Sequence, residues 1–179
     1  MEGLNVKLVR RGERYLPDRF IRASDFPDQL AQANNPEWKT LAVDEMTGQV
    51  VVPNVSIGFR WGQIDGKWNL EQKQAGGGET KLALTLIDRR DGVAPVAFPY
   101  FGGIPHESFM NNDQGGDVLV RGVPVRKLLL NDGETLVASV FDLLLANYGI
   151  DRGLDGSNAA RSYGQNVPYT PVWQEAITG

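Results

Sequence analysis

The stretch VLVRGVPVRKLLLNDGETLVASVFDLLLANYG, residues 118–149, carries the clearest structural signal in the chain. Two runs with β propensity, Val123–Leu130 and Thr135–Val140, flank Asn131-Asp132-Gly133-Glu134. Asn, Asp and Gly are the residues that tight turns between antiparallel strands favour. The stretch therefore predicts a hairpin and indicates a fold in which antiparallel strands predominate.

A helix is expected directly after this hairpin. Ser139 and Asp142 have the spacing of a capping box, and Gly149 is well placed to end the helix. Apolar residues recur at helical spacing between them and extend nearly all round the helix, so we expect burial from more than one direction, with Leu144 in the core. Residues 123–149 are thus predicted to form one hairpin-plus-helix unit. The recurring apolar residues are Val140, Phe141, Leu144, Leu145 and Tyr148.

The N-terminal side predicts a hairpin and then a helix. Short β-prone runs around a glycine turn indicate a hairpin over residues 1–22. A helix is expected over residues 23–34, because Ser24 can cap it and Pro27 is tolerated in a first turn. It should end near Pro36, since the residue before a proline is disfavoured in helical geometry.

The rest of the chain predicts strands joined by long loops. Residues 38–130 are expected to be β-rich, with a hairpin at their start and a glycine-rich loop at Gly76-Gly77-Gly78. Residues 151–179 are expected to form a loop and a truncated helix, with Thr170 as cap and Pro171 in the first turn. The predicted fold class is α+β, with mostly short antiparallel strands and hairpins, a few helices and long loops. The 179 residues are expected to form a single unit.

Composition excludes several classes of function. Eighteen Lys and Arg against 22 Asp and Glu give a formal charge of -4, which disfavours nucleic acid as a partner. No apolar run approaches the ~18–20 residues that a membrane helix needs, so direct membrane insertion is not expected. The chain has no cysteine, which removes thiol nucleophiles, disulfides and cysteine ligands for zinc or iron–sulfur clusters.

Candidate catalytic and ligand-binding residues are few. His106 is the single histidine, and it lies in a glycine-rich run that is typical of an exposed loop rather than of a catalytic triad. Asn111–Asp117 has the oxygen-rich composition of a calcium loop, but the closing acid is missing because Gly122 occupies the twelfth position. Phe59-Arg60-Trp61 and Lys67-Trp68 are more consistent with structural stacking than with nucleic-acid binding in an acidic chain.

Six runs, in order along the chain, resemble the catalytic alpha subunit of respiratory nitrate reductases. They spread from about residue 15 to the end and include several aromatic residues, which we expect to be core anchors: Trp38, Trp61, Trp68, Tyr100 and Trp173. The six runs are Asn35-Pro36-Glu37-Trp38-Lys39-Thr40, Ser56-Ile57-Gly58-Phe59-Arg60-Trp61-Gly62, Gly66-Lys67-Trp68-Asn69-Leu70-Glu71, Phe98-Pro99-Tyr100-Phe101-Gly102-Gly103, Leu145-Ala146-Asn147-Tyr148-Gly149 with Arg152-Gly153-Leu154, and Tyr169-Thr170-Pro171-Val172-Trp173 before Ile177-Thr178-Gly179.

This resemblance implies an internal segment of a much longer molybdoenzyme of the dimethyl-sulfoxide-reductase superfamily. Such a subunit reduces nitrate to nitrite in anaerobic respiration, with quinol-derived electrons, at molybdenum held by two molybdopterin guanine dinucleotides. It also carries one 4Fe-4S cluster. It works with an iron–sulfur beta subunit and a membrane cytochrome b gamma subunit at the cytoplasmic face of the inner membrane. The resemblance places the metal ligands outside this chain, so the fragment alone is expected to hold no cofactor and to be inactive.

No catalytic or metal-ligand role carries over to any position. Arg60 and Asn147 are the candidates for facing the cofactor cavity of the intact subunit, although both lie beside packing residues. A rival interpretation is a stand-alone β-rich binding or interaction module, which should close its own core. A small hydrolase using His106 is disfavoured because no nucleophile motif accompanies it.

Overall fold

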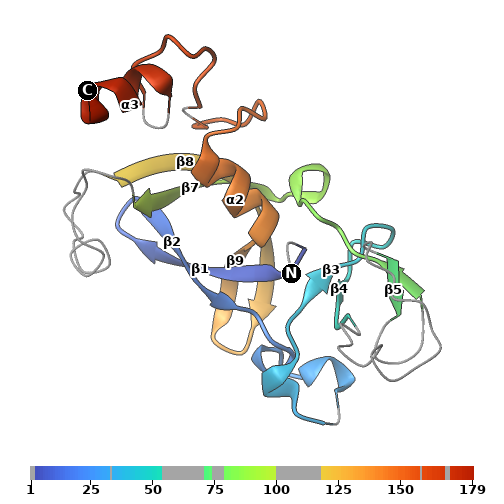
Figure 1. Ribbon diagram of the computed structural model, residues 1–179. Coiled ribbons are helices and arrows are strands. Elements are labelled where there is room, and N and C mark those ends of the chain that lie inside the picture. Colours follow the sequence, from blue (N-terminus) through green and yellow to red (C-terminus); the bar gives the residue numbers. More distant parts are fainter. Residues whose placement is uncertain are drawn as a thin grey trace.

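Five strands, the first of them near the N-terminus, close into a barrel (Figure 1). The computed structural model describes residues 3–32, 34–53, 71–73, 79–99, 118–157, 159–167 and 170–179. The order of the strands around the barrel is β1-β2-β7-β8-β9. Their bounds are β1 Asn5–Arg11, β2 Arg14–Phe20, β7 Gly92–Pro99, β8 Val118–Leu130 and β9 Gly133–Ser139.

The barrel contains five pairs of neighbouring strands, here called seams, and the pairing is antiparallel at four of them. β1 pairs with β2 and β8 with β9, which are two of the hairpins that the sequence predicts. β7 pairs with β8 along its whole length, and β1 returns to pair with β9 from Asn5↔Ser139 to Lys7↔Val137. The fifth seam is parallel and joins β2 to β7 at Tyr15↔Val96.

Alternate residues of the strands face inward, as the two-residue period of a strand requires. Val6, Ala94, Val96 and Val123 belong to the main core cluster and are nearly inaccessible to solvent. A second cluster lies on the other face of the β8–β9 hairpin, where Leu128, Leu130 and Val137 pack with Ile21 and Leu41. The α+β class predicted from the sequence is confirmed.

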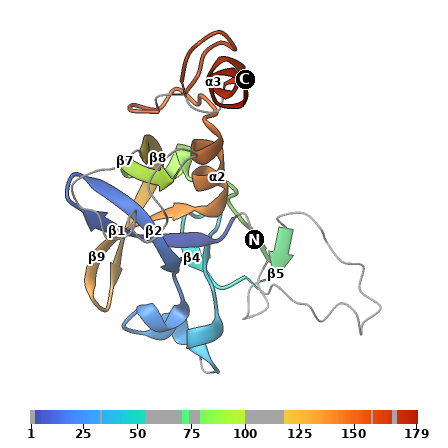
Figure 2. The same cartoon turned by 60° about the vertical axis from the view of Figure 1, so that its left-hand side comes forward.

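Helix α2, Val140–Tyr148, packs against the barrel beside β8 (Figures 1 and 2). The Ser139 hydroxyl accepts a hydrogen bond from the Asp142 amide, and Gly149 ends the helix at φ 73°, where a side chain would be strained. Leu143 and Ala146 face the core. Leu144 is 40% exposed, so its expected burial is wrong: the barrel covers one side of α2 only.

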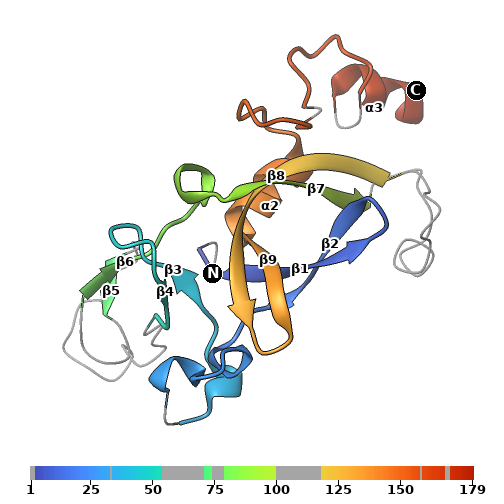
Figure 3. The same cartoon turned by 180° about the vertical axis from the view of Figure 1, so that it is seen from behind.

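Two small sheets lie beside the barrel (Figure 3). One pairs β3, Ala42–Val43, with β4, Val50–Val51, and the other pairs β5, Glu71–Lys73, with β6, Glu79–Lys81. Val43 packs with Ala83 and Leu86 in a small buried cluster. A 3₁₀ turn, η5, follows at Ile87–Arg89 and leads into β7.

The continuous helix expected over residues 23–34 is wrong. The described part of this segment forms two 3₁₀ turns, η1 at Ala23–Asp25 and η2 at Gln29–Ala31. Phe26 lies between them in extended geometry, with φ -99° and ψ 146°. The cause is Pro27, whose ring disfavours helical geometry for the residue before it.

Trp38 corrects a second expectation. It lies in the 3₁₀ turn η3, Pro36–Trp38, and is 79% exposed, so it does not anchor a core in this chain. At the other end, helix α3, Pro171–Thr178, begins at the predicted proline with Thr170 as its cap. Most of its described side chains are exposed, and it stands away from the barrel (Figures 1 and 2).

Candidate functional site

Asp142 is the centre of a buried polar junction at the start of α2. Its side chain is completely buried, and both carboxylate oxygens accept hydrogen bonds. Oδ2 accepts from the Leu86 amide at 2.8 Å and from the Ser139 hydroxyl at 2.8 Å. Oδ1 accepts from the Thr85 hydroxyl at 2.5 Å. The capping box places Asp142 here, and the segment before β7 then contacts it from the other side.

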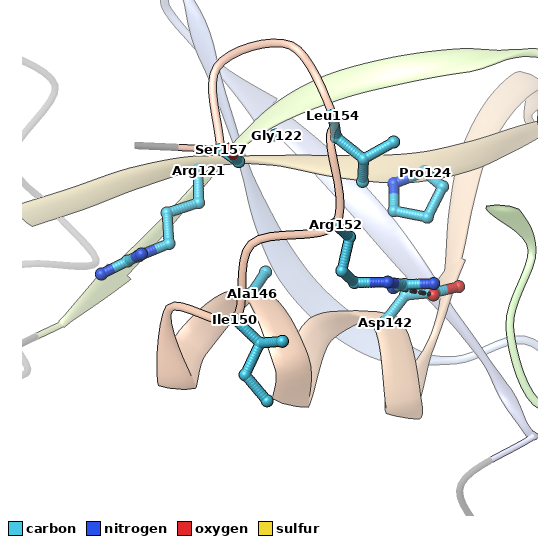
Figure 4. Close-up of a pocket in the computed structure, with 9 residues that line it drawn as sticks. All are labelled: Arg121, Gly122, Pro124, Asp142, Ala146, Ile150, Arg152, Leu154 and Ser157. Atoms are coloured by element: carbon cyan, nitrogen blue, oxygen red, sulfur yellow. Dashed lines mark hydrogen bonds and ion pairs between the residues drawn. The ribbon is translucent and has the colours of Figure 1, made fainter. Parts of the chain in front are cut away.

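Arg152 completes the junction (Figure 4). Its Nη1 lies 2.6 Å from Asp142 Oδ1, and its Nη2 donates to the Thr85 hydroxyl at 2.6 Å. With two donors on each oxygen, the carboxylate has its charge compensated and its hydrogen-bonding capacity used. The junction is therefore suited to holding three segments together and offers no free base for catalysis.

The cavity beside this junction is too small for a substrate. Its volume is about 10 Å³, room for at most one water molecule. Gly122 forms part of its wall, where the 151–157 loop crosses β8. A side chain at Gly122 would place its Cβ 2.0 Å from the Asp155 carbonyl oxygen, and the Gly122 amide donates to the Gly156 carbonyl at 2.8 Å. The close approach of two backbones explains the glycine.

Asp44 is a second buried carboxylate, in the turn between β3 and β4. Its Oδ1 accepts from the Met46 and Thr47 amides at 3.0 and 2.7 Å, and Oδ2 accepts from the Thr80 hydroxyl. Burial by itself raises the pKa of Asp44, but the hydrogen bonds from Thr80, Thr47 and the Lys81 amide outweigh it and lower the pKa to about 2. This carboxylate stabilises a turn and is ionised at neutral pH.

A larger cleft opens between β1 and β9. Its volume is about 360 Å³, which falls within the ~300–1,000 Å³ range of ordinary ligand clefts. Its apolar lining comes from Leu8, Tyr15 and Leu136, which also contact the main core. Polar and charged side chains complete the lining: Arg10, Lys127, Glu134 and Thr135. This composition suits recognition of a polar or extended ligand and lacks a nucleophile–base pair.

Of the residues predicted as site candidates, Asn147 lies within the part of the chain that the structure describes. Asn147 is half-buried near the end of α2, and it is not among the residues that line the small cavity there. Arg60, His106 and the Asn111–Asp117 run lie outside the described residues, as do Gly76–Gly78, Trp61, Trp68 and Tyr100. Within the part of the chain that the structure describes, no group of three or more His, Cys, Asp or Glu side chains could hold a metal ion.

Sequence reasoning missed the partners of Asp142 and the whole cleft. The Ser139–Asp142 spacing predicted a helix cap, but nothing in the sequence pointed to Thr85 or Arg152 as partners. The cleft arises because two strands far apart in the chain diverge, and no local pattern reports that. The sequence does show two charged residues, Arg10 and Arg11, after the apolar residues of β1, but such a pair is also typical of an ordinary solvated strand.

Comparison with known proteins gives long alignments to nitrate reductase alpha chains. The chain is 57% identical over 166 residues to respiratory nitrate reductase 2 alpha chain of Escherichia coli (strain K12), an alignment that covers 92% of this chain. It is 51% identical over 176 residues to respiratory nitrate reductase 1 alpha chain of the same organism, and 37% identical over 177 residues to nitrate reductase alpha chain of Bacillus subtilis (strain 168). Each of these two alignments covers 97% of this chain.

The chain belongs to the nitrate reductase alpha-chain family. The resemblance seen in the six sequence runs is thereby confirmed. The chain spans only 13% and 14% of the lengths of the two Escherichia coli alpha chains. It is therefore a portion of the alpha subunit, and its relatives contain several times more polypeptide. No family model matches the chain.

Two further structural findings concern the helices of this alpha-chain segment. No helix in the described ranges is long and apolar enough to cross a membrane. The outer side of α2 and the residues after it expose a row of large apolar side chains: Leu144 at 40%, Tyr148 at 66% and Ile150 at 48%. An apolar row of this kind is typical of a surface that another part of a protein covers.

Proposed function

We propose that this chain is a structural portion of the catalytic alpha subunit of a respiratory nitrate reductase. In the intact subunit, nitrate is reduced to nitrite with quinol-derived electrons, as in anaerobic respiration. The observation that carries the proposal is the 57% identity over 92% of the chain. The Asp142 carboxylate already accepts hydrogen bonds at both oxygens, and α2 exposes a row of apolar side chains. Both observations support a role in shaping the body of the subunit rather than in the chemistry itself.

The cofactors of the intact subunit are proposed to be a molybdenum bis-molybdopterin guanine dinucleotide and one 4Fe-4S cluster. The residues of this chain do not fit the cluster, because it has no cysteine and a single histidine. The cluster ligands must therefore come from other parts of the subunit. Arg60 and Asn147 remain proposed neighbours of the molybdenum cofactor.

The remaining proposals concern organisation and partners. We propose that residues 1–179 fold as one unit that packs against the rest of the alpha chain. The intact subunit works with an iron–sulfur beta subunit and a membrane cytochrome b gamma subunit at the cytoplasmic face of the inner membrane. This chain enters neither the membrane nor a nucleic-acid complex.

A chimeric subunit tests this function. The matching segment of the Escherichia coli nitrate reductase 2 alpha chain is replaced by this chain, and nitrate-dependent oxidation of a reduced dye is measured. We expect turnover within about tenfold of the parent, and none from a subunit with the segment deleted. A chimera that contains its molybdenum and iron but does not turn over nitrate would contradict the proposal.

One observation favours the alternative of a stand-alone binding module. The five strands form a continuous ring of pairings around a buried core, as expected of such a module. Isothermal calorimetry of the purified chain with nitrate separates the two functions. Specific, stoichiometric uptake of nitrate would favour the module, and its absence would favour the structural portion of a larger subunit.

A further inference from the structure

The pairing of β1 with β9, which closes the barrel, covers only part of these two strands. The two strands pair only at Asn5, Val6 and Lys7 of β1, opposite Ser139, Ala138 and Val137 of β9. Beyond Lys7, β1 continues for four more residues along β2, and β9 continues to Gly133 along β8. Each strand thus keeps its partner on one side and has no strand on the other within the described part of the chain.

The register shows which backbone groups face this opening. Hydrogen-bonding groups alternate between the two sides of a strand. The Arg11↔Arg14 pair closes the β1–β2 turn, so the backbone groups of Leu8 and Arg10 point away from β2. Pro17 stands opposite Leu8 and has no N–H to donate, which is compatible with this assignment.

The same reasoning holds for the other strand. The Leu130↔Gly133 pair closes the β8–β9 turn, so the backbone groups of Glu134 and Leu136 point away from β8. Leu8, Arg10, Glu134 and Leu136 are also four of the residues that line the 360 Å³ cleft. Two open strand edges therefore face each other across one cleft.

The charges of the residues that line the cleft indicate which kind of segment it would bind. Lys127 and Glu134 lie 3.7 Å apart and compensate each other. Arg10 donates to the Gly12 carbonyl, and no carboxylate among the described residues pairs with it. Arg11 and Arg14 follow at the tip of the same hairpin, against the single acid Glu13. The cleft thus combines an apolar floor, two backbone edges and an excess of positive charge.

We propose that this cleft binds an extended polypeptide segment as an added β-strand, and that the segment is an acidic stretch of the alpha chain outside these 179 residues. Strand addition uses main-chain hydrogen bonds for affinity and alternate side chains for specificity. An open edge left unpaired is an aggregation risk that native proteins cover. The proposal rests on the proposed function for its occupant, because the alpha-chain relatives contain most of their polypeptide outside this segment.

A defined peptide tests the cleft on the full 179-residue chain. The probe is acetyl-Thr-Val-Glu-Val-Glu-Val-Thr-amide, and the readout is amide hydrogen exchange at Leu8, Arg10, Glu134 and Leu136. We expect saturating peptide to slow exchange at these amides at least about tenfold. The same peptide with Lys in place of Glu should bind at least about tenfold more weakly. Unchanged exchange at all four amides, or equal binding of both peptides, would overturn the proposal.

Two matched variants test whether the peptide binds in the cleft. Arg10→Glu should weaken binding of the acidic probe about tenfold or more. Arg161→Glu should leave it unchanged, because Arg161 is exposed and does not line the cleft. Equal effects of the two variants would show that only net charge matters and would refute a specific site. Protection of the four amides that rises with chain concentration, without peptide, would identify a second copy as the occupant and would likewise refute the proposal.

The identity of the occupant is tested in the chimeric subunit. Without added peptide, segments 6–11 and 133–137 should exchange at least about tenfold more slowly there than in the 179-residue chain. Exchange at the same rate in both would reject the rest of the subunit as occupant. This result is independent of turnover: loss of nitrate reduction with protection intact would count against the proposed function alone.

Discussion

Arg152 and Asp142 form an ion pair whose side chains are 14% and 0% exposed. Removing one member of a buried pair leaves the other charge without compensation, which costs about 3–5 kcal/mol. We expect Arg152→Met to lower the free energy of unfolding by that amount in urea titrations. Arg161→Met is the control, because Arg161 pairs with Asp151 at the surface and should cost less than about 1 kcal/mol. Equal losses in the two variants would contradict a buried junction.

Asp44 should make stability depend on pH in the acid range. Its folded-state pKa of about 2 lies below its ordinary value of 3.8, so its stabilisation is complete above about pH 4. It is lost as the pH falls towards about 2. The difference in unfolding free energy between the native chain and Asp44→Asn should shrink by on the order of 2 kcal/mol across that window. A difference that stays constant from pH 6 to pH 2 would refute this role.

Single residues were predictable only where their partners were local. The Ser139–Asp142 spacing predicted the helix cap that the structure contains, because both groups lie within one turn. Thr85 is 57 residues from Asp142 in the chain, and no sequence pattern links the two positions. Long-range partners depend on how the barrel closes, which a local pattern does not report.

Helix α2 offers a matched pair of leucines that the structure separates. Leu143 is buried in the main core, whereas the neighbouring Leu144 is 40% exposed. Leu143→Ala should therefore cost about 2–5 kcal/mol of unfolding free energy, as for a buried leucine. Leu144→Ala should cost less than about 1 kcal/mol in this chain. Urea titrations that rank the two in the opposite order would show that α2 is rotated.

Helix α3 should be less stable than α2. It has two turns, its described side chains are mostly exposed, and a helix of that length is marginal without packing. Amides from Thr170 to Gly179 should exchange much faster than those from Leu143 to Tyr148. The measurement is native-state hydrogen exchange at a concentration where the chain is monomeric. Equal protection of the two helices would mean that another surface covers α3.

Elements with several agreeing signals were predicted well, and the helix expected over residues 23–34 failed for one reason. Turn chemistry, capping and apolar period agree for β8, β9 and α2, and the structure contains all three. Over residues 23–34, Pro27 was assigned to a first helical turn. The restriction that Pro27 places on Phe26 outweighed the tolerance of proline in a first helical turn, and the segment is divided into two 3₁₀ turns.

At the scale of the whole molecule, the hairpins were predictable and their closure into a barrel was not. The β2–β7 seam is parallel and joins Tyr15 to Val96, and the β1–β9 seam joins Asn5 to Ser139. Both seams connect strands that are distant in sequence. Short apolar runs specify a strand and its inward face, but several partners satisfy the same pattern.

The purified chain should contain neither molybdenum nor iron and should show no nitrate-dependent oxidation of a reduced dye. The reason is its donor set, which lacks cysteine and includes only one histidine. Elemental analysis and a dye assay after repurification measure the two properties. Stoichiometric metal, or turnover that survives repurification, would contradict this expectation.

The pairing of β1 with β9 also has a consequence for synthesis on the ribosome. Lys7 contacts Asp132, a partner 125 residues later in the chain. At elongation rates of ~5–20 residues per second, β1 emerges on the order of ten seconds before the strand that completes the barrel. During that interval Val6 and Leu8, both buried in the finished barrel, are exposed on the nascent polypeptide. The β1–β2 hairpin should therefore be available to ribosome-associated chaperones until β9 has emerged.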